Sequence, residues 1–329
     1  MALDNETAAF LQHMAEARPS SARPIWEMQP ADAREAGAGL RDLYGAGPEM
    51  YRIENHELDA FDGGTFRVRV LVPSESPAAV LVYLHGGGWV LEDIDGYDTL
   101  GRTLAERSGT AVILVEYRKA PEFPFPTPVE DSWTALRWAA EQRLAIAGDN
   151  VPLWVAGDSS GGNLAAVLTQ RARDFGGPDL EGQILIYPVT DADLTRSSYL
   201  DPANQVVIDA DTMRWFWNHY APDEDARKLP EVSPLRAESL QGLPDALIIT
   251  AEHDVLRDEG EAYAHRLTDH GVTVQYHRWP GQMHLFFSLV NVLPASSEAI
   301  ELVASHLRGR ARSEADGRMS TAVLRKTAQ

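Results

Sequence analysis

The pentapeptide Gly157–Gly161, Gly-Asp-Ser-Ser-Gly, places a serine between two glycines. It follows the apolar run 151–156 and precedes a helix-like stretch over 163–173. A serine at such a strand–turn–helix corner is held in a strained backbone conformation with its hydroxyl pushed outward. Glycine is needed on both sides because larger side chains do not fit there. By chance, a G-x-S-x-G occurs in about one chain of this length in ten, so the prediction depends on the strand expected before it and the helix expected after it. The pattern predicts Ser159 as a nucleophile.

A second glycine cluster, His85-Gly86-Gly87-Gly88-Trp89, follows the buried strand expected over 79–84. Successive glycines let the backbone approach a ligand closely and turn N–H groups inward. A phosphate-binding loop is the competing interpretation, but neither G-x-x-x-x-G-K-[ST] nor a strand-linked G-x-G-x-x-G is present. A glycine loop after an early strand, upstream of a nucleophilic serine, is typical of an oxyanion hole and predicts acyl-transfer chemistry.

An orienting acid is expected after the serine, in the loop that follows a strand. The apolar run 246–249 predicts that strand, and Asp254 lies just beyond its end. Asp258 and Glu259 come one turn later and are typical first-turn acids of a helix running to about residue 270. Glu252 remains an alternative, although it lies closer to the strand.

Five histidines follow Asp254 and compete for the role of general base. Four have structural interpretations: His265 and His270 on a helix, His277 inside the strand 272–279, and His306 in a C-terminal helix. His284 follows that strand in a loop rich in glycine and proline, of the kind that carries catalytic groups. The sequence therefore predicts His284 as the base.

Together these blocks make the chain resemble the bacterial hormone-sensitive-lipase-like (family IV) esterases of the α/β-hydrolase superfamily. The resemblance rests on His85–Trp89, Glu116–Pro126, Gly157–Gly162, Asp254–Gly260 and Met283-His284, and extends from about residue 51 to 308. Two positions depart from the family pattern. Ser160 stands where alanine is usual, which leaves its backbone N–H available, and Leu285 stands where glycine is usual, which would narrow the acyl site.

The resemblance implies an α/β-hydrolase fold: a mostly parallel central sheet with helices on both faces and a helical cap. It implies a Ser159–Asp254–His284 triad, with the N–H groups of Gly87, Gly88 and Ser160 binding the oxyanion. By analogy the cap combines the N-terminal helices with a polar insertion at about 191–234, in which residues 213–220 are rich in aromatic side chains. A surface helix anchored by those aromatics is the alternative. Trp89, Trp215 and Leu285 are predicted to line the substrate pocket.

The strand-like segments alternate with helical stretches from about residue 79 onward, which favours a parallel sheet with right-handed crossovers. The expected organisation is N-terminal cap helices over 1–48, a catalytic domain over 49–310 with the cap insertion, and a tail over 311–329. An amphipathic helix is expected over 32–43 with Asp32 as its N-cap. Glu122 is expected to form an ion pair with Arg118 behind the glycine loop.

Composition narrows the partners. The chain has 329 residues, a formal net charge of −20 and no cysteine. The charge argues against nucleic acid and anionic membranes as partners, and no apolar run predicts a membrane span. No disulfide or thiolate metal site is expected, and the histidine spacing predicts no metal and no cofactor. Residues 1–14 lack the apolar core of a signal peptide, so a cytoplasmic location is expected. A homodimer is a further possibility.

Three functions fit these motifs to different degrees. A carboxylesterase acting on short- to medium-chain acyl esters through an acyl-enzyme accounts for all of them. An amidase or deacetylase of an acetylated small metabolite would use the same triad, and no sequence feature separates it from an esterase. A non-enzymatic small-molecule receptor on the same fold is the third alternative, but such a receptor would be expected to lack a member of the triad.

Overall fold

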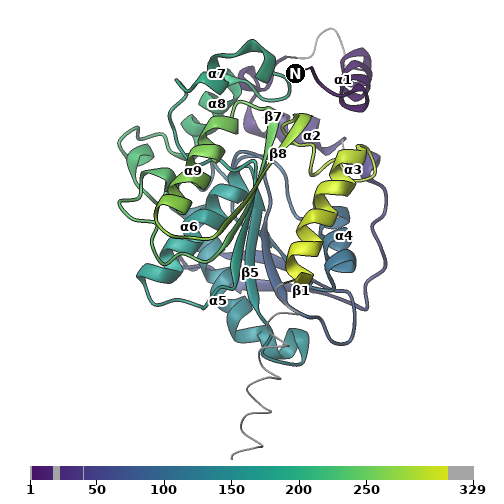
Figure 1. The fold of residues 1–329 in the computed structure, drawn as a ribbon, viewed down its shortest axis with the longest axis vertical. Coiled ribbons are helices and arrows are strands. Elements are labelled where there is room, and N and C mark those ends of the chain that lie inside the picture. Colours follow the sequence, from purple (N-terminus) through teal and green to yellow (C-terminus); the bar gives the residue numbers. More distant parts are fainter. Residues whose placement is uncertain (1, 18–22, 40, 310–329) are drawn as a thin grey trace, which may run out of the picture.

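A computed structural model describes residues 2–17, 23–39 and 41–309 of the chain. Its centre is one sheet of eight strands in the order β1-β2-β4-β3-β5-β6-β7-β8 (Figure 1). The strands are β1 Arg52–Asp59, β2 Thr65–Val72, β3 Val80–Leu84, β4 Ala111–Glu116, β5 Leu153–Asp158, β6 Gly182–Ile186, β7 Ala246–His253 and β8 Val274–Met283. β2 pairs antiparallel with β1 and β4, whereas all the other pairings are parallel.

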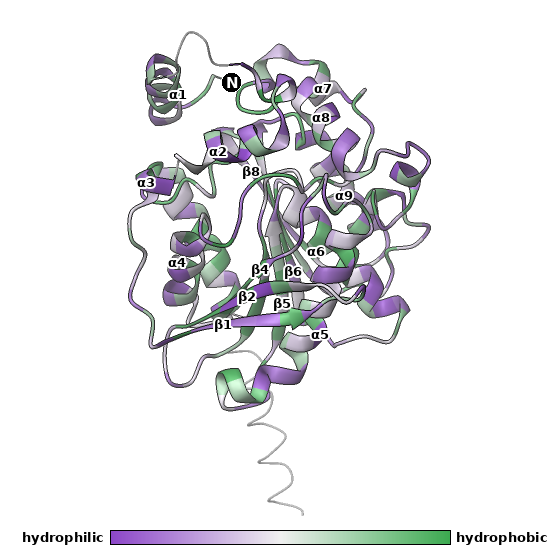
Figure 2. Ribbon diagram, turned by 180° about the vertical axis from the view of Figure 1, so that it is seen from behind, coloured by the Kyte–Doolittle hydropathy of each residue, from purple (hydrophilic) through white to green (hydrophobic). Residues whose placement is uncertain are grey.

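The inner strands are apolar along their whole length, as expected for parallel strands that are covered on both faces. All five residues of β3 are buried, as are all six of β5. β1, at one edge of the sheet, instead alternates partly buried and exposed residues. Figure 2 shows this contrast, with hydrophobic inner strands and a more hydrophilic β1. The sequence pattern thus locates the middle of the sheet, where the carboxyl ends of β3 and β5 lie side by side.

Helices cover both faces of the sheet. α5 (Thr127–Ala147), α6 (Ser160–Asp174) and α9 (Arg257–Asp269) contribute to the hydrophobic core on one face. α4 (Asp98–Ser108) and a helix over residues 294–309 contribute to the core on the other face. This is the doubly covered sheet that the alternation of strands and helices predicts. The α/β-hydrolase fold expected from the sequence is therefore confirmed.

Two further groups of helices lie over the carboxyl ends of the strands (Figure 1). One comes from the N-terminus and comprises α1 (Asn5–Ala17), a 3-10 turn η1 (Ile25–Glu27), α2 (Pro30–Ala38) and α3 (Arg41–Tyr44). The other lies between β6 and β7 and comprises α7 (Ser197–Leu200), η2 (Pro202–Asn204), α8 (Ala210–Tyr220), η3 (Ala226–Lys228) and η4 (Pro234–Arg236). α8 is the aromatic stretch noted in the sequence. The two groups cover the site described below.

Local details differ from expectation in two places. The helix predicted over 32–43 is divided into α2 and α3, and α2 begins at Pro30 with Gln29 as its N-cap. Asp32 is therefore a first-turn acid, because proline is favoured at the first helical position and starts the helix earlier. The segment before His284 is not a loop, since β8 continues through Pro280-Gly281 to Met283. The predicted tail over 311–329 lies outside the described residues.

No helix in the described part of the chain combines the length and the apolar character needed to cross a membrane.

Candidate active site

Ser159 lies at the corner between β5 and α6, in the backbone conformation that the glycine spacing predicts. Its φ is +55° and its ψ is −119°, outside the regions that non-glycine residues normally occupy. Its N–H donates to the Ile186 carbonyl over 2.9 Å, and its own carbonyl accepts from Val189 over 3.1 Å. Bonds to the end of β6 and to the segment after it thus hold the strained residue in place, and its side chain lines the central cavity.

His284 connects Ser159 to Asp254. Its Nε2 lies 3.1 Å from the Ser159 Oγ, and its Nδ1 lies 2.7 Å from the Asp254 Oδ2. The other oxygen of Asp254 accepts from the Leu256 N–H over 3.0 Å, which fixes the carboxylate at the end of β7. Asp254 is fully buried and His284 is 2% exposed. Three residues far apart in sequence therefore form one hydrogen-bonded array with the geometry of a catalytic triad.

The competing acids are engaged elsewhere. Glu259 is buried, and its Oε1 accepts from the Thr190 N–H over 2.8 Å. Asp258 accepts from the Ser198 N–H over 2.8 Å and pairs with Arg257. Glu252 accepts from the Gly281 N–H over 2.8 Å. Of the acids considered in the sequence, only Asp254 lies within hydrogen-bond distance of the imidazole in the described structure.

The glycine loop that follows β3 passes beside Ser159. Gly87 and Gly88 have φ values of +100° and +59°, and both line the same cavity as Ser159. Ser160 begins α6, where a backbone N–H has no partner within its own helix. Among the described residues, no hydrogen bond uses the N–H of Gly87, Gly88 or Ser160. Three uncommitted backbone donors are therefore available beside the serine.

Asp158, the residue before the serine, joins this loop to the nucleophile corner. Its carboxylate accepts from the Tyr83 hydroxyl (3.0 Å), the Tyr97 hydroxyl (2.8 Å) and the Gly86 N–H (3.1 Å). Burial raises the pKa of Asp158 to about 6, against the effect of these donors. No local pattern in the sequence indicates this network. An acid next to the serine was visible, but its tyrosine partners lie more than 60 residues away.

His85 supports the loop from beneath. Its ring stacks on Tyr117 with centroids 4.3 Å apart, and the Tyr117 hydroxyl donates to the His85 carbonyl over 2.8 Å. Burial, with help from the charge of Lys119, lowers the pKa of His85 to about 4. His85 is therefore a neutral, stacked side chain at neutral pH.

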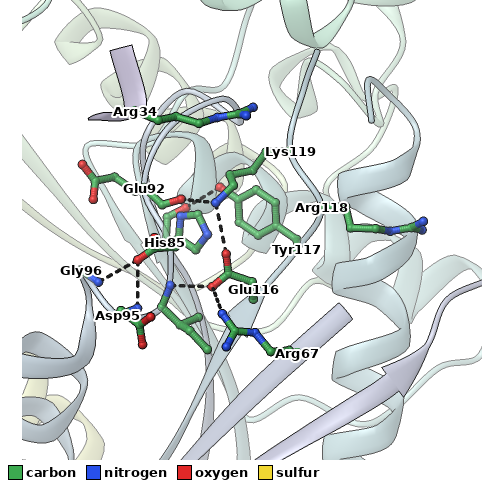
Figure 3. Close-up of polar contacts among 12 residues, drawn as sticks. Arg34, Arg67, His85, Glu92, Asp95, Gly96, Glu116, Tyr117, Arg118 and Lys119 are labelled. Carbon is green, nitrogen blue, oxygen red and sulfur yellow. Dashed lines mark hydrogen bonds and ion pairs between the residues drawn. The ribbon is translucent and has the colours of Figure 1, made fainter. Parts of the chain in front are cut away.

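Charged residues hold the far end of the loop, as Figure 3 shows. Glu116, at the end of β4, accepts from the Ile94 N–H over 2.9 Å and pairs with Lys119 over 3.1 Å. Lys119 also donates to the Glu92 carbonyl. These contacts attach the far end of the glycine loop to the carboxyl end of β4.

The prediction that Glu122 forms an ion pair with Arg118 is wrong. Arg118 pairs with Asp131 at 2.8 Å and with Asp62 at 2.9 Å. Glu122 instead pairs with Arg34 of α2 at 2.6 Å. Sequence proximity suggested the first pairing, but Arg118 binds both carboxylate oxygens of buried Asp131 on α5, while both oxygens of Glu122 bind Arg34. The actual pairing joins the N-terminal helices to the loop that follows β4.

A cavity of about 810 Å³ opens above Ser159 and His284. Its walls come from the glycine loop, from the N-terminal segment and from residues 206–216. Most of its large side chains are apolar: Leu11, Met14, Ile25, Trp26, Met28, Leu91, Leu100, Val206, Val207, Ile208, Phe216 and Leu285. This size and apolar character are typical of a small-molecule site.

The three residues proposed for the pocket wall are placed differently. Leu285 lies in the wall, with a φ of +74°. Trp89 is fully buried and stacks on Tyr220 with ring centroids 4.0 Å apart, so it packs behind the loop. Trp215 is 9% exposed and does not line this cavity; its neighbour Phe216 does. On a helix, adjacent residues point about 100° apart, so naming the correct stretch does not select the correct face.

Comparisons with known proteins identify the family of this chain. The sequence model for the α/β-hydrolase fold matches residues 81–288. A carboxylesterase of Mycobacterium tuberculosis, NlhH, is 42% identical over 258 residues, which cover 77% of this chain and 80% of that protein. Ethyl acetate hydrolase of Pseudomonas putida is 36% identical over 319 residues, covering 94% and 99% respectively. The solved structure of a hyperthermophilic esterase from the archaeon Pyrobaculum calidifontis superposes with a TM-score of 0.87 at 35% identity, covering 94% of this chain and 99% of the other.

Proposed function

Since this chain belongs to the α/β-hydrolase family, in its hormone-sensitive-lipase-like group of carboxylesterases, we propose that it hydrolyses short- to medium-chain acyl esters through an acyl-enzyme on Ser159. The observation that carries the proposal is the continuous hydrogen-bonded path from Asp254 through His284 to the Ser159 hydroxyl. The apolar cavity above that hydroxyl supports an acyl chain as the group bound there.

In the first half-reaction, His284 takes the proton of the Ser159 hydroxyl as the oxygen attacks the ester carbonyl carbon. The carbon becomes tetrahedral and its oxygen gains a negative charge. Asp254 holds the imidazole in the tautomer whose Nε2 accepts, and it stabilises the imidazolium that forms. The imidazolium then donates its proton to the leaving alkoxide, which departs as an alcohol and leaves an acyl-serine.

We assign the oxyanion hole to the N–H groups of Gly87, Gly88 and Ser160. Donors fixed before the reaction begins stabilise the developing charge without reorganisation, and removal of one such donor in a measured case costs about 3–4 kcal/mol of barrier. Ser160, at the first position of α6, also adds the positive end of that helix dipole. In the second half-reaction His284 takes a proton from a water molecule, which attacks the acyl carbon. The imidazolium then returns the proton to the Ser159 oxygen as its bond to the acyl carbon breaks, which releases the carboxylic acid and regenerates the serine.

We assign the cavity cover to two segments, the N-terminal helices within 1–48 and the insertion at about 191–234, over a catalytic domain spanning 49–310. The support is that both segments supply cavity walls, for example Met28 from the first and Phe216 from the second. We assign Leu285, in the cavity wall beside His284, to substrate binding. A cytoplasmic location and a homodimer stay predictions, and light scattering on the purified protein tests the dimer.

The experiment is a series of p-nitrophenyl esters from acetate to dodecanoate, with the Ser159→Ala variant as control. We expect hydrolysis by the wild-type protein, fastest among the shorter chains, and none above background by the variant. Equal rates for the two proteins would contradict the proposal. A matched p-nitrophenyl acetate and p-nitroacetanilide pair separates the esterase from the amidase alternative, since amide cleavage should be much slower.

A further inference from the structure

Glu92 places a carboxylate in the wall of the catalytic cavity, and the proposed reaction does not use it. It lies on the glycine loop, and its φ of +58° is one that residues with a Cβ rarely adopt. Its side chain passes Gly87, and its carboxylate ends near Gly37 of α2 and Gly96. A Cβ on Gly96 would lie 2.9 Å from the Glu92 Oε2, so glycine at that position leaves the carboxylate room. It lines the cavity together with Ser159 and His284. The loop conformation and the neighbouring glycines thus leave space for a charged group in the wall of the cavity that contains the reacting serine.

The cations near Glu92 are bound to other acids. Arg41 pairs with Asp93 at 2.6 Å, and Lys119 pairs with Glu116 at 3.1 Å. Lys119 does reach Glu92, but at its backbone carbonyl oxygen. Figure 3 shows the carboxylate directed away from Lys119. Among the described residues, no hydrogen bond or ion pair within 4.0 Å involves the Glu92 carboxylate. Its oxygens are therefore free to bind a donor that enters the cavity.

The surroundings make a positive partner favourable. Burial, together with the charges of Asp93 and Asp158, raises the pKa of Glu92 to about 7, although Arg41 and Lys119 act to lower it. A carboxylate that lacks solvation gains more from a cation than one in water does.

The cavity wall contains two other ionisable side chains besides His284, namely Asp209 and Arg23. Asp209 caps α8 through the Thr212 N–H, and Arg23 lies 3.9 Å from Asp32. The net charge of −20 also attracts cations.

We propose that Glu92 is a specificity-determining residue that binds a protonated amine of the substrate, so that the enzyme prefers amino esters over neutral esters of the same shape. The ammonium would donate to the Glu92 carboxylate while the ester carbonyl lies at Ser159. The inference rests on the proposed esterase function and adds a substrate class to it.

The test uses isosteric ester pairs that differ only by an ammonium in place of a CH group. One pair carries it in the alcohol part: 2-(dimethylamino)ethyl acetate and 3-methylbutyl acetate. The other carries it in the acyl part: ethyl 4-(dimethylamino)butanoate and ethyl 5-methylhexanoate. The measured quantity is the ratio of kcat/KM for the amino ester to that for its neutral partner, in the wild-type protein and in Glu92→Gln.

We expect a ratio above one in at least one pair for the wild type, falling about tenfold or more in Glu92→Gln, as loss of a charge-assisted hydrogen bond requires. Hydrolysis of the neutral ester should continue in the variant. Glu75→Gln, at an exposed glutamate in the turn between β2 and β3, is the matched control and should keep the wild-type ratio. Glu92→Asp retains the charge and should keep part of the preference.

Two results would overturn the assignment: a wild-type ratio of one or less in both pairs, or a smaller than tenfold fall in Glu92→Gln. The first result is read from the wild-type protein alone, and the second from the ratios of the wild type and Glu92→Gln measured side by side. Failure of the esterase proposal itself is distinguishable, because the neutral esters would then also remain intact with the wild-type protein.

Discussion

Gly161→Ala offers a sharp test of the nucleophile corner, because two effects of opposite sign act on it. Gly161 lies in the first turn of α6, and alanine in place of glycine favours a helix by about 1 kcal/mol. A Cβ at this position, however, would lie 1.9 Å from the Leu84 carbonyl oxygen and 2.6 Å from that of His85. Ordinary contacts are about 3.5 Å. The end of β3 would have to move by more than 1 Å.

Overpacking costs about 1–3 kcal/mol where side chains can yield. Here the atoms in the way are backbone carbonyls at the start of the glycine loop, so we expect a net destabilisation of at least about 3 kcal/mol. Activity should fall as well, about a hundredfold, since Gly87 and Gly88 would shift with the loop.

Urea unfolding gives the stability change, and kcat on p-nitrophenyl acetate gives the activity. Gly309→Ala is the control, since a Cβ there meets nothing within 4 Å. If the unfolding free energy of Gly161→Ala lay within about 1 kcal/mol of the wild-type value and turnover were normal, the claim that a Cβ does not fit against the Leu84 carbonyl would be refuted.

Two further predictions concern the acids. Asp254→Asn should lower kcat by about 10⁴-fold, as in a measured triad, whereas Asp258→Asn should keep most activity; the reverse result would reassign the orienting acid. Burial raises the pKa of Asp158 to about 6, so its contribution to stability is complete below pH 4 and is lost as the pH rises through 6. The Asp158→Asn variant lacks this pH-dependent contribution. Between pH 4 and 7 the unfolding free energy of the wild type, measured with urea, should therefore fall by about 3 kcal/mol relative to that of the variant. An equal change in both free energies between the two pH values would contradict this.

The sheet was predictable because its strands carry a local signal. The buried runs that form β3 and β5 are continuous apolar segments bounded by polar or glycine-rich turns, and both strands lie within about two residues of where the pattern indicates. The limits of β8 were less evident, because Pro280 and Gly281 argue for a loop, yet the strand continues past a register shift near Ala251 and His253. An edge strand tolerates proline since one side has no neighbour to bond.

The candidate triad was predictable for a similar reason. Ser159, Asp254 and His284 each follow a strand end, and the carboxyl ends of parallel strands meet at one edge of the sheet. Side chains that act between distant elements were not predictable. The partner of Arg118 is Asp131 on α5, and that of Glu122 is Arg34 on α2. Such pairings depend on how helices lie across the sheet, which no local pattern encodes.

The central claim, that His284 activates the Ser159 hydroxyl, is tested most directly by stoichiometric labelling with a fluorophosphonate ester, followed by peptide mass spectrometry. We predict one phosphonyl group per chain on Ser159 in the wild-type protein, no label on Ser159→Ala, and labelling at least about a hundredfold slower on a folded His284→Ala variant. A label on another residue, or equally fast labelling without the imidazole, would contradict the account.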